Sequence, residues 1–320
     1  ELFKRITIRS NERMDRLNRS IASSERCKEY ASRAESIFVG NHVDTDKLME
    51  SGAFNPRELF SYSTIKSSPL SKSRLNHRDP SSLTSILSKD RFQNLRRLYL
   101  YEAQFDEALA LPNLEIYTSV LSSSISIDAE VAFTSVNLPN LRRLVIYHGF
   151  TQPRSMGKHF DSIIPQLDHL SLSRVDKTEL EHLLLLSTSL QSLHCYYDGS
   201  EHEGLAKALD QIRRNDIKEL HFKWVVERES SHNWETDFEA IAKFKNVMGG
   251  KDELERVTLE LSFDYSQRPS SDVCNRALLR WKGIKDELNS IGLKNGIKVV
   301  IVSCRYCYDD DESDKPLWME

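Results

Sequence analysis

The chain has 320 residues, of which 39% are hydrophobic, so it can bury the core of one large domain or of two ordinary ones. A formal net charge of −4 and a pI near 6.3 argue against an overall basic field for nucleic acids or anionic membranes. No apolar run is long enough to span a bilayer, and Glu1 to Arg5 lacks the apolar core of a signal peptide, so we expect a cytoplasmic or nuclear protein.

The first predicted elements are a strand over Leu2 to Ser10 and a helical pattern over Asn11 to Gly40. We assign residues 1–60 to an N-terminal cap or to irregular first repeats. Residues 61–92 are predicted to be a serine-rich loop or insert, because Ser61 to Ser88 contains ten serines and no periodic apolar face. Such a composition cannot bury enough apolar surface to offset the entropy lost on ordering.

A spacing of the form LxxLxL then recurs along the chain, which is typical of a repeat architecture. The copies are "LRRLYL" from Leu95, "LRRLVI" from Leu141, "LDHLSL" from Leu167, "LQSLHC" from Leu190, "IKELHF" from Ile217 and "LERVTL" from Leu254. From Leu141 onward their first residues lie 26, 23, 27 and 37 residues apart. A further copy in "LPNLEIYTSV" is ambiguous, since Leu111, Leu114 and Ile116 fit the spacing but a shifted register fits as well.

Helical patterns lie between these predicted strands, over Lys177 to Ser187, Ser200 to Arg214 and Thr236 to Val247. Each strand and helix has an apolar side that it cannot bury alone, so neighbouring units must stack. Residues 93–265 therefore predict an α/β fold of the leucine-rich repeat type. This is a curved horseshoe solenoid with a parallel sheet on the concave face and helices on the convex face.

The end of the chain is predicted to close this solenoid. Residues 266–308 contain a long helical pattern over Ser271 to Gly292 and an apolar strand over Gly296 to Cys304, which together suit a capping unit. Residues 309–320 form an acidic tail that is either solvated or in contact with a basic partner. The five scattered cysteines favour reduced thiols over a disulfide framework, and Cys195 lies inside an apolar strand pattern.

The motifs from Leu95 to Leu261 resemble those of leucine-rich repeat proteins with long, irregular repeats, as in F-box proteins of fungi. The strand and helix at the N-terminus are similar to the segment that follows an F-box in such proteins. The F-box itself is absent from this chain and would lie before Glu1. The resemblance implies a substrate receptor of a cullin-based ubiquitin ligase that grips a Skp-type adaptor through that segment. The alternative is a generic solenoid cap unrelated to ubiquitylation.

Motifs for catalysis, cofactors or metals are missing from the sequence. It contains no GxSxG, HExxH or GxGxxG, so we expect no enzyme activity and no cofactor. Cys304 and Cys307 form an isolated CxxC without a second ligand pair, which is a weak zinc pattern, so we expect no bound metal.

The predicted concave face carries the best candidates for a binding site. Side chains alternate along a strand, so the residues between the core leucines should face solvent. The candidates for partner binding are Arg97, Tyr99, Tyr101, Arg143, Tyr147, His169, His194, Tyr196, His221, Lys223 and Arg256. Arginine and tyrosine are enriched at binding hot spots, although tyrosine also suits exposed strands. We therefore expect a non-catalytic scaffold that binds a polypeptide rather than a membrane. A nucleic-acid-binding repeat protein is the alternative.

Overall fold

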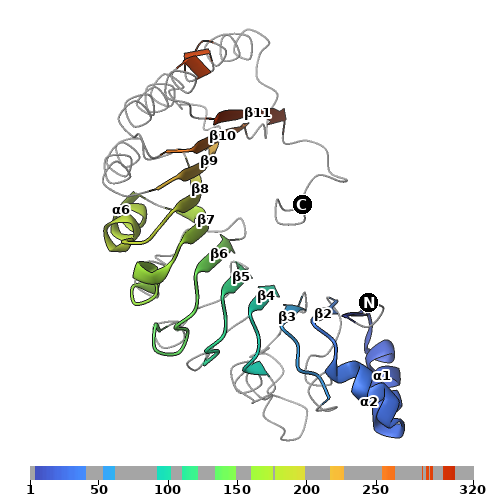
Figure 1. The fold of residues 1–320 in the computed structure, drawn as a ribbon. Coiled ribbons are helices and arrows are strands. Elements are labelled where there is room, and N and C mark those ends of the chain that lie inside the picture. Colours follow the sequence, from blue (N-terminus) through green and yellow to red (C-terminus); the bar gives the residue numbers. More distant parts are fainter. Residues whose placement is uncertain are drawn as a thin grey trace, which may run out of the picture. The chain divides into compact units, whose positions relative to one another are not determined.

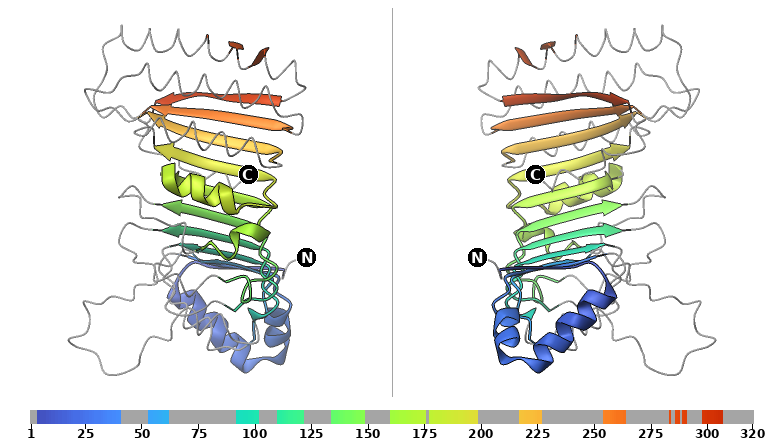
Figure 2. Two further views of the ribbon diagram at one scale, coloured as in Figure 1. Left: turned by 90° about the vertical axis from the view of Figure 1, so that its left-hand side faces the viewer. Right: turned by 90° about the vertical axis from the view of Figure 1, so that its right-hand side faces the viewer.

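The computed structural model describes residues 4–40, 53–61, 92–101, 110–121, 134–148, 160–175, 177–198, 217–226, 254–263, 283, 286–287, 289–290 and 298–306. The chain forms two compact units, Glu1–Ser171 (the N-terminal unit) and Leu172–Glu320 (the C-terminal unit). Both contain parallel strands that follow one another in chain order, so the protein has an α/β fold built on a parallel sheet. Figures 1 and 2 show the strands of each unit side by side and running in the same direction.

The N-terminal unit has six consecutive strands, each paired in parallel with the next. They are β1 (Arg5–Ile8), β2 (Ser36–Val39), β3 (Glu58–Ser61), β4 (Arg97–Tyr101), β5 (Ile116–Leu121) and β6 (Arg143–His148). A short 3₁₀ helix η3 (Ile164–Gln166) precedes β7 (His169–Val175), which starts in this unit and ends in the other. Three of these strands, β1, β2 and β3, precede the first repeat found in the sequence.

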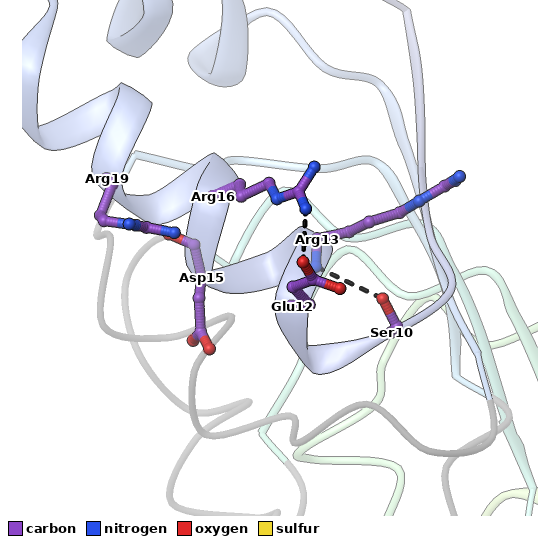
Figure 3. Close-up of polar contacts among 6 residues, drawn as sticks. All are labelled: Ser10, Glu12, Arg13, Asp15, Arg16 and Arg19. Atoms are coloured by element: carbon purple, nitrogen blue, oxygen red, sulfur yellow. Dashed lines mark hydrogen bonds and ion pairs between the residues drawn. The ribbon is translucent and has the colours of Figure 1, made fainter.

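Two helices, α1 (Asn11–Ser23) and α2 (Glu25–Ser32), connect β1 to β2. Ser10 caps α1, since its hydroxyl accepts a hydrogen bond from the Arg13 backbone amide at 3.4 Å (Figure 3). The single helix expected over Asn11 to Gly40 is wrong. Ser24 adopts an extended conformation that ends α1, and its hydroxyl accepts a bond from Cys27 to start α2.

The core of the N-terminal unit is a row of apolar side chains that runs across the strands. The register aligns Ile37, Leu59, Leu98, Tyr117 and Leu144, and all five are buried. The ambiguous repeat therefore takes its shifted register, in which Tyr117 occupies the leucine position at 1% exposure. Burial also raises the pKa of the Tyr117 hydroxyl far above its usual value, so it stays neutral in the core.

Side-chain amides tie each turn of the N-terminal unit to the turn before it. Asn113 Nδ2 donates to the Gln93 carbonyl at 2.7 Å, and Asn140 Nδ2 donates to the Pro112 carbonyl at 2.7 Å. Gln166 Nε2 then donates to the Leu138 carbonyl, also at 2.7 Å. These amides satisfy backbone carbonyls that the strands cannot pair, because they lie just before each strand begins.

The C-terminal unit repeats the same strand arrangement. After α6 (Lys177–Leu186) come β8 (Ser192–Asp198), β9 (Glu219–Val226), β10 (Arg256–Phe263) and β11 (Lys298–Tyr306), which pair in parallel in this order. The register aligns Leu193, Leu220 and Val257, and all three are buried. Cys195 is a buried free thiol as predicted, and burial raises its pKa.

Several predictions from the sequence can be compared with these units. The expected burial of Leu98, Leu144, Leu170, Leu193, Leu220 and Val257 is confirmed. The helix near Lys177 and the strand near Gly296 are confirmed as α6 and β11. Most of the serine-rich insert, the helices expected over residues 200–214 and 236–247, and the acidic tail lie outside the described residues. Among the described helices, none has the length and apolar character needed to cross a bilayer.

Candidate functional site

The sheet has a second face, opposite the buried leucines, where parallel pairing aligns side chains from neighbouring strands in rows. In the N-terminal unit the first row contains Ser36, Glu58 and Arg97, from β2, β3 and β4. The Ser36 hydroxyl donates to Glu58 Oε2 at 2.6 Å, and Arg97 Nη1 lies 3.2 Å from Glu58 Oε1. We call these three residues the N-terminal Ser–Glu–Arg row. It holds one carboxylate between a hydroxyl and a guanidinium.

The next row of the N-terminal unit is aromatic and contains Phe38, Phe60 and Tyr99. The rings of Phe38 and Phe60 stack with centroids 4.3 Å apart, and those of Phe60 and Tyr99 lie 6.1 Å apart. The Arg5 guanidinium sits 3.8 Å from the Phe38 centroid, a cation–π contact that covers the end of the row. This aromatic row forms a continuous stacked surface with a charged cap.

The C-terminal unit has its own Ser–Glu–Arg row, formed by Ser192, Glu219 and Arg256 from β8, β9 and β10. Arg256 Nη2 donates to Glu219 Oε2 at 2.9 Å, and the Ser192 hydroxyl donates to the same oxygen at 3.5 Å. The order of the three residue types along the sheet is the same as in the N-terminal unit. The contact between the hydroxyl and the carboxylate is longer here.

In the next row, two residues further along each strand, the C-terminal unit has histidines where the N-terminal unit has phenylalanines. His194 and His221 are register partners, and their ring centroids lie 5.1 Å apart at an interplanar angle of 53°. Both rings are half-buried. We call this pair the histidine row. An imidazole can donate a hydrogen bond through one ring nitrogen and accept one through the other.

Two candidates on β6 belong to the same face of the N-terminal unit. Arg143 is exposed, whereas Tyr147 is half-buried. Burial raises the pKa of the Tyr147 hydroxyl, and its hydrogen bond with Ser171 and the nearby charge of Arg143 oppose that rise more weakly. Tyr147 is therefore partly engaged within the unit and presents only part of its ring to a partner.

The predicted site residues divide by their accessibility. Arg97, Arg143 and Arg256 are exposed, and Tyr147, His169, His194 and His221 are half-buried. The expected exposure of Tyr99 is wrong, since it is only 4% exposed and its ring packs beside Phe60. Tyr101, Tyr196 and Lys223 lie in β4, β8 and β9, but their side chains are outside the described residues.

The sequence analysis missed part of this face, namely Arg5, Phe38, Glu58 and Phe60. The pattern that could have revealed them is the alternation in "SIFV" and "ELFS", where Ile37 and Leu59 occupy the core positions. Both segments lack the first leucine of the repeat, since Ala34 and Pro56 occupy that position, so the LxxLxL spacing does not extend to them.

Each unit has a sheet face suited to binding. The N-terminal unit combines guanidinium groups with stacked rings, and the C-terminal unit combines a guanidinium group with imidazoles. In the described part of the chain, histidine, cysteine and acidic side chains form no group of three that could hold a metal ion. Cys304 lies in β11, and Cys307 is outside the described residues. No protein-family model matches the sequence, and no curated protein is significantly similar to it.

Proposed function

We propose that the chain is a leucine-rich repeat solenoid that binds a polypeptide on its concave sheet face. The observation that supports this most directly is the in-register alignment of arginine, histidine and aromatic side chains opposite the leucine core. Arginine and aromatic residues supply most of the binding energy at protein interfaces. Fixed rows on adjacent strands would present them to an extended partner with little loss of side-chain entropy.

We propose further that this polypeptide is the substrate of an F-box-type ubiquitin ligase receptor. The support is the resemblance of the repeat motifs and of the N-terminal strand and helices to fungal F-box proteins. In this role the chain selects the substrate and performs no chemistry itself. A Skp-type adaptor would be bound by a segment upstream of Glu1.

A quantitative affinity purification tests the binding face. The test variant is the double substitution Arg97→Ala and Arg143→Ala, because both side chains are exposed on this face and Arg97 is paired with Glu58. The matched control is Arg13→Ala with Arg16→Ala on α1, where both are exposed and Arg16 is paired with Glu12 (Figure 3).

We expect the test variant to lose specific polypeptides that the wild type and the control retain. A hot-spot residue contributes about 2 kcal/mol or more, so the loss of even one of the two weakens binding by about 30-fold. Those polypeptides should also become ubiquitylated in a manner that depends on the full-length protein. Equal recovery by all three proteins contradicts the proposal. Loss of recovery after nuclease treatment favours nucleic-acid binding instead.

A further inference from the structure

A hollow of about 700 Å³ lies at the edge of the N-terminal unit where its first strands begin. It is separate from the face described above, because its walls come from the residues that precede β1 to β5 and from the end of α2. The residues that line it are Lys4, Tyr30, Ser32, Arg33, Ala34, Glu35, Asn55, Arg57, Asn94, Arg96 and Asn113. Its size falls within the range of small-molecule sites, which is about 300 to 1,000 Å³.

The charge of this hollow is opposite to that of the chain. Four cationic side chains line it against the single carboxylate of Glu35, whereas the chain as a whole has a net charge of −4. Lys4, Arg33 and Arg96 are partly neutralised. Lys4 lies 3.6 Å from Glu35, Arg96 lies 3.5 Å from Glu115, and Arg33 forms an ion pair with Glu29. Arg57 lines the hollow with an exposed side chain and makes no ion pair with any described residue.

The backbone places these charges next to one another. The amides of Arg57 and Glu58 donate to the Glu35 carbonyl, and those of Arg96 and Arg97 donate to the Arg57 carbonyl. Arg57 and Arg96 therefore precede neighbouring strands and are direct neighbours along the sheet edge. Both arginines also line the hollow, and a guanidinium group can contact the oxygens of a phosphate group in a bidentate manner.

Amide side chains complete the polar lining. Asn94 Nδ2 donates to Asn55 Oδ1 at 3.3 Å, and Asn113 Nδ2 donates to the Gln93 carbonyl at 2.7 Å. These bonds fix the orientation of the amides and leave further donor and acceptor positions on them. Such groups suit the hydroxyl or amide substituents of a ligand. The end of α2 opposes an anion, and Arg33, the residue directly after the helix, is paired with Glu29, so the phosphate contacts must come from the other side of the hollow.

We propose that this hollow binds a small phosphorylated molecule, with Arg57 and Arg96 as the main contacts to its phosphate. The asparagines would contact its polar substituents. This site is independent of the polypeptide-binding face, so either one can fail a test without affecting the other. Most of its cationic side chains are exposed, so binding should weaken as ionic strength rises.

Isothermal titration calorimetry with inorganic pyrophosphate tests the proposal on the full chain. The test variant is Arg57→Gln with Arg96→Gln. The matched control is Arg13→Gln with Arg16→Gln on α1, a pair that also contains one arginine in an ion pair and one without (Figure 3). Circular dichroism confirms that both variants fold. A single-stranded oligonucleotide is titrated in parallel.

We expect the wild type and the control to bind pyrophosphate alike, and the test variant to bind it at least about tenfold more weakly, which corresponds to about 1.4 kcal/mol. Doubling the salt concentration should weaken binding by the wild type. Absence of binding at millimolar pyrophosphate would overturn the proposal, and so would equal binding by the test variant. Binding of the oligonucleotide alone, lost in the test variant, would also overturn it in favour of nucleic acid.

Discussion

The two units place the same three residue types in the same order on three consecutive strands, but they differ in the row that follows. Ser36, Glu58 and Arg97 in the N-terminal unit correspond to Ser192, Glu219 and Arg256 in the C-terminal unit. Two residues further along each strand, the N-terminal unit has stacked aromatic rings and the C-terminal unit has the histidine row.

This difference shows which positions belong to the scaffold and which define the surface. A carboxylate held by a hydroxyl and a guanidinium joins three strands at the point where each begins, and it recurs. In the following row, ring contacts join the strands, and the residue types differ between the two units. Binding specificity in this fold should therefore reside in the second row.

The largest expected effect is the loss of unfolding free energy when a buried core leucine is removed from either unit. Leu59→Ala and Leu220→Ala each remove a buried side chain from the central strand of a row, and each should lower the free energy of unfolding by about 2 to 5 kcal/mol. Urea denaturation measures both. Leu185→Ala is the control, since this leucine in α6 is 63% exposed and should cost within about 0.5 kcal/mol. If either substitution lowers the free energy of unfolding as little as Leu185→Ala does, the two cores are not equivalent.

A smaller effect distinguishes the second rows. Phe60→Ala removes a ring that stacks on both Phe38 and Tyr99, so we expect the free energy of unfolding to fall by about 1 to 3 kcal/mol. His221→Ala removes the ring contact with His194 and should cost about 1 kcal/mol or less. Urea denaturation of both variants gives the two values. If the histidine substitution proves as costly, the histidine row is also structural.

The smallest effect concerns the Ser–Glu–Arg rows. Glu58→Gln and Glu219→Gln remove the charge that pairs with arginine, and each should cost about 0.2 to 1 kcal/mol. The Glu58 side chain is 27% exposed and that of Glu219 is 37% exposed, so the first substitution should cost more. Thermal denaturation at low and high salt measures this, because screening reduces the contribution of an exposed pair. If the stability lost is the same at low and high salt, it comes from the hydrogen bonds rather than from the charge of the pair.

The repeated spacing of leucines was sufficient to predict β4 and β6 to β10 with their buried leucine positions, but it did not predict β2 and β3. That success has a physical cause, since a residue period of two fixes which side chains face the core once one leucine is placed. The helical pattern over Asn11 to Gly40 did not reveal the break at Ser24, which ends one helix and caps the next. It also left Tyr117 ambiguous, because a tyrosine at a core position looks like a surface residue in a strand.

The candidate site was predicted less completely than the fold. Alternation places Arg97 and His221 on the correct face, but it does not reveal how neighbours cover one another. Tyr99 is buried because Phe60 packs beside it, and Phe60 lies in β3, a strand without the LxxLxL spacing. The hollow at Arg57 could not be predicted at all, since its walls lie in segments far apart in the sequence that only strand pairing brings together.

The amide bonds between turns have a consequence for how the N-terminal unit acquires its structure. The bonds of Asn113 and Asn140 close loops of 20 and 28 residues, respectively, and each requires only the preceding turn to be in place. A growing chain can therefore add one turn at a time onto a folded neighbour as it leaves the ribosome. Closure of such short loops is also entropically inexpensive, which lowers the kinetic barrier that parallel sheets normally face.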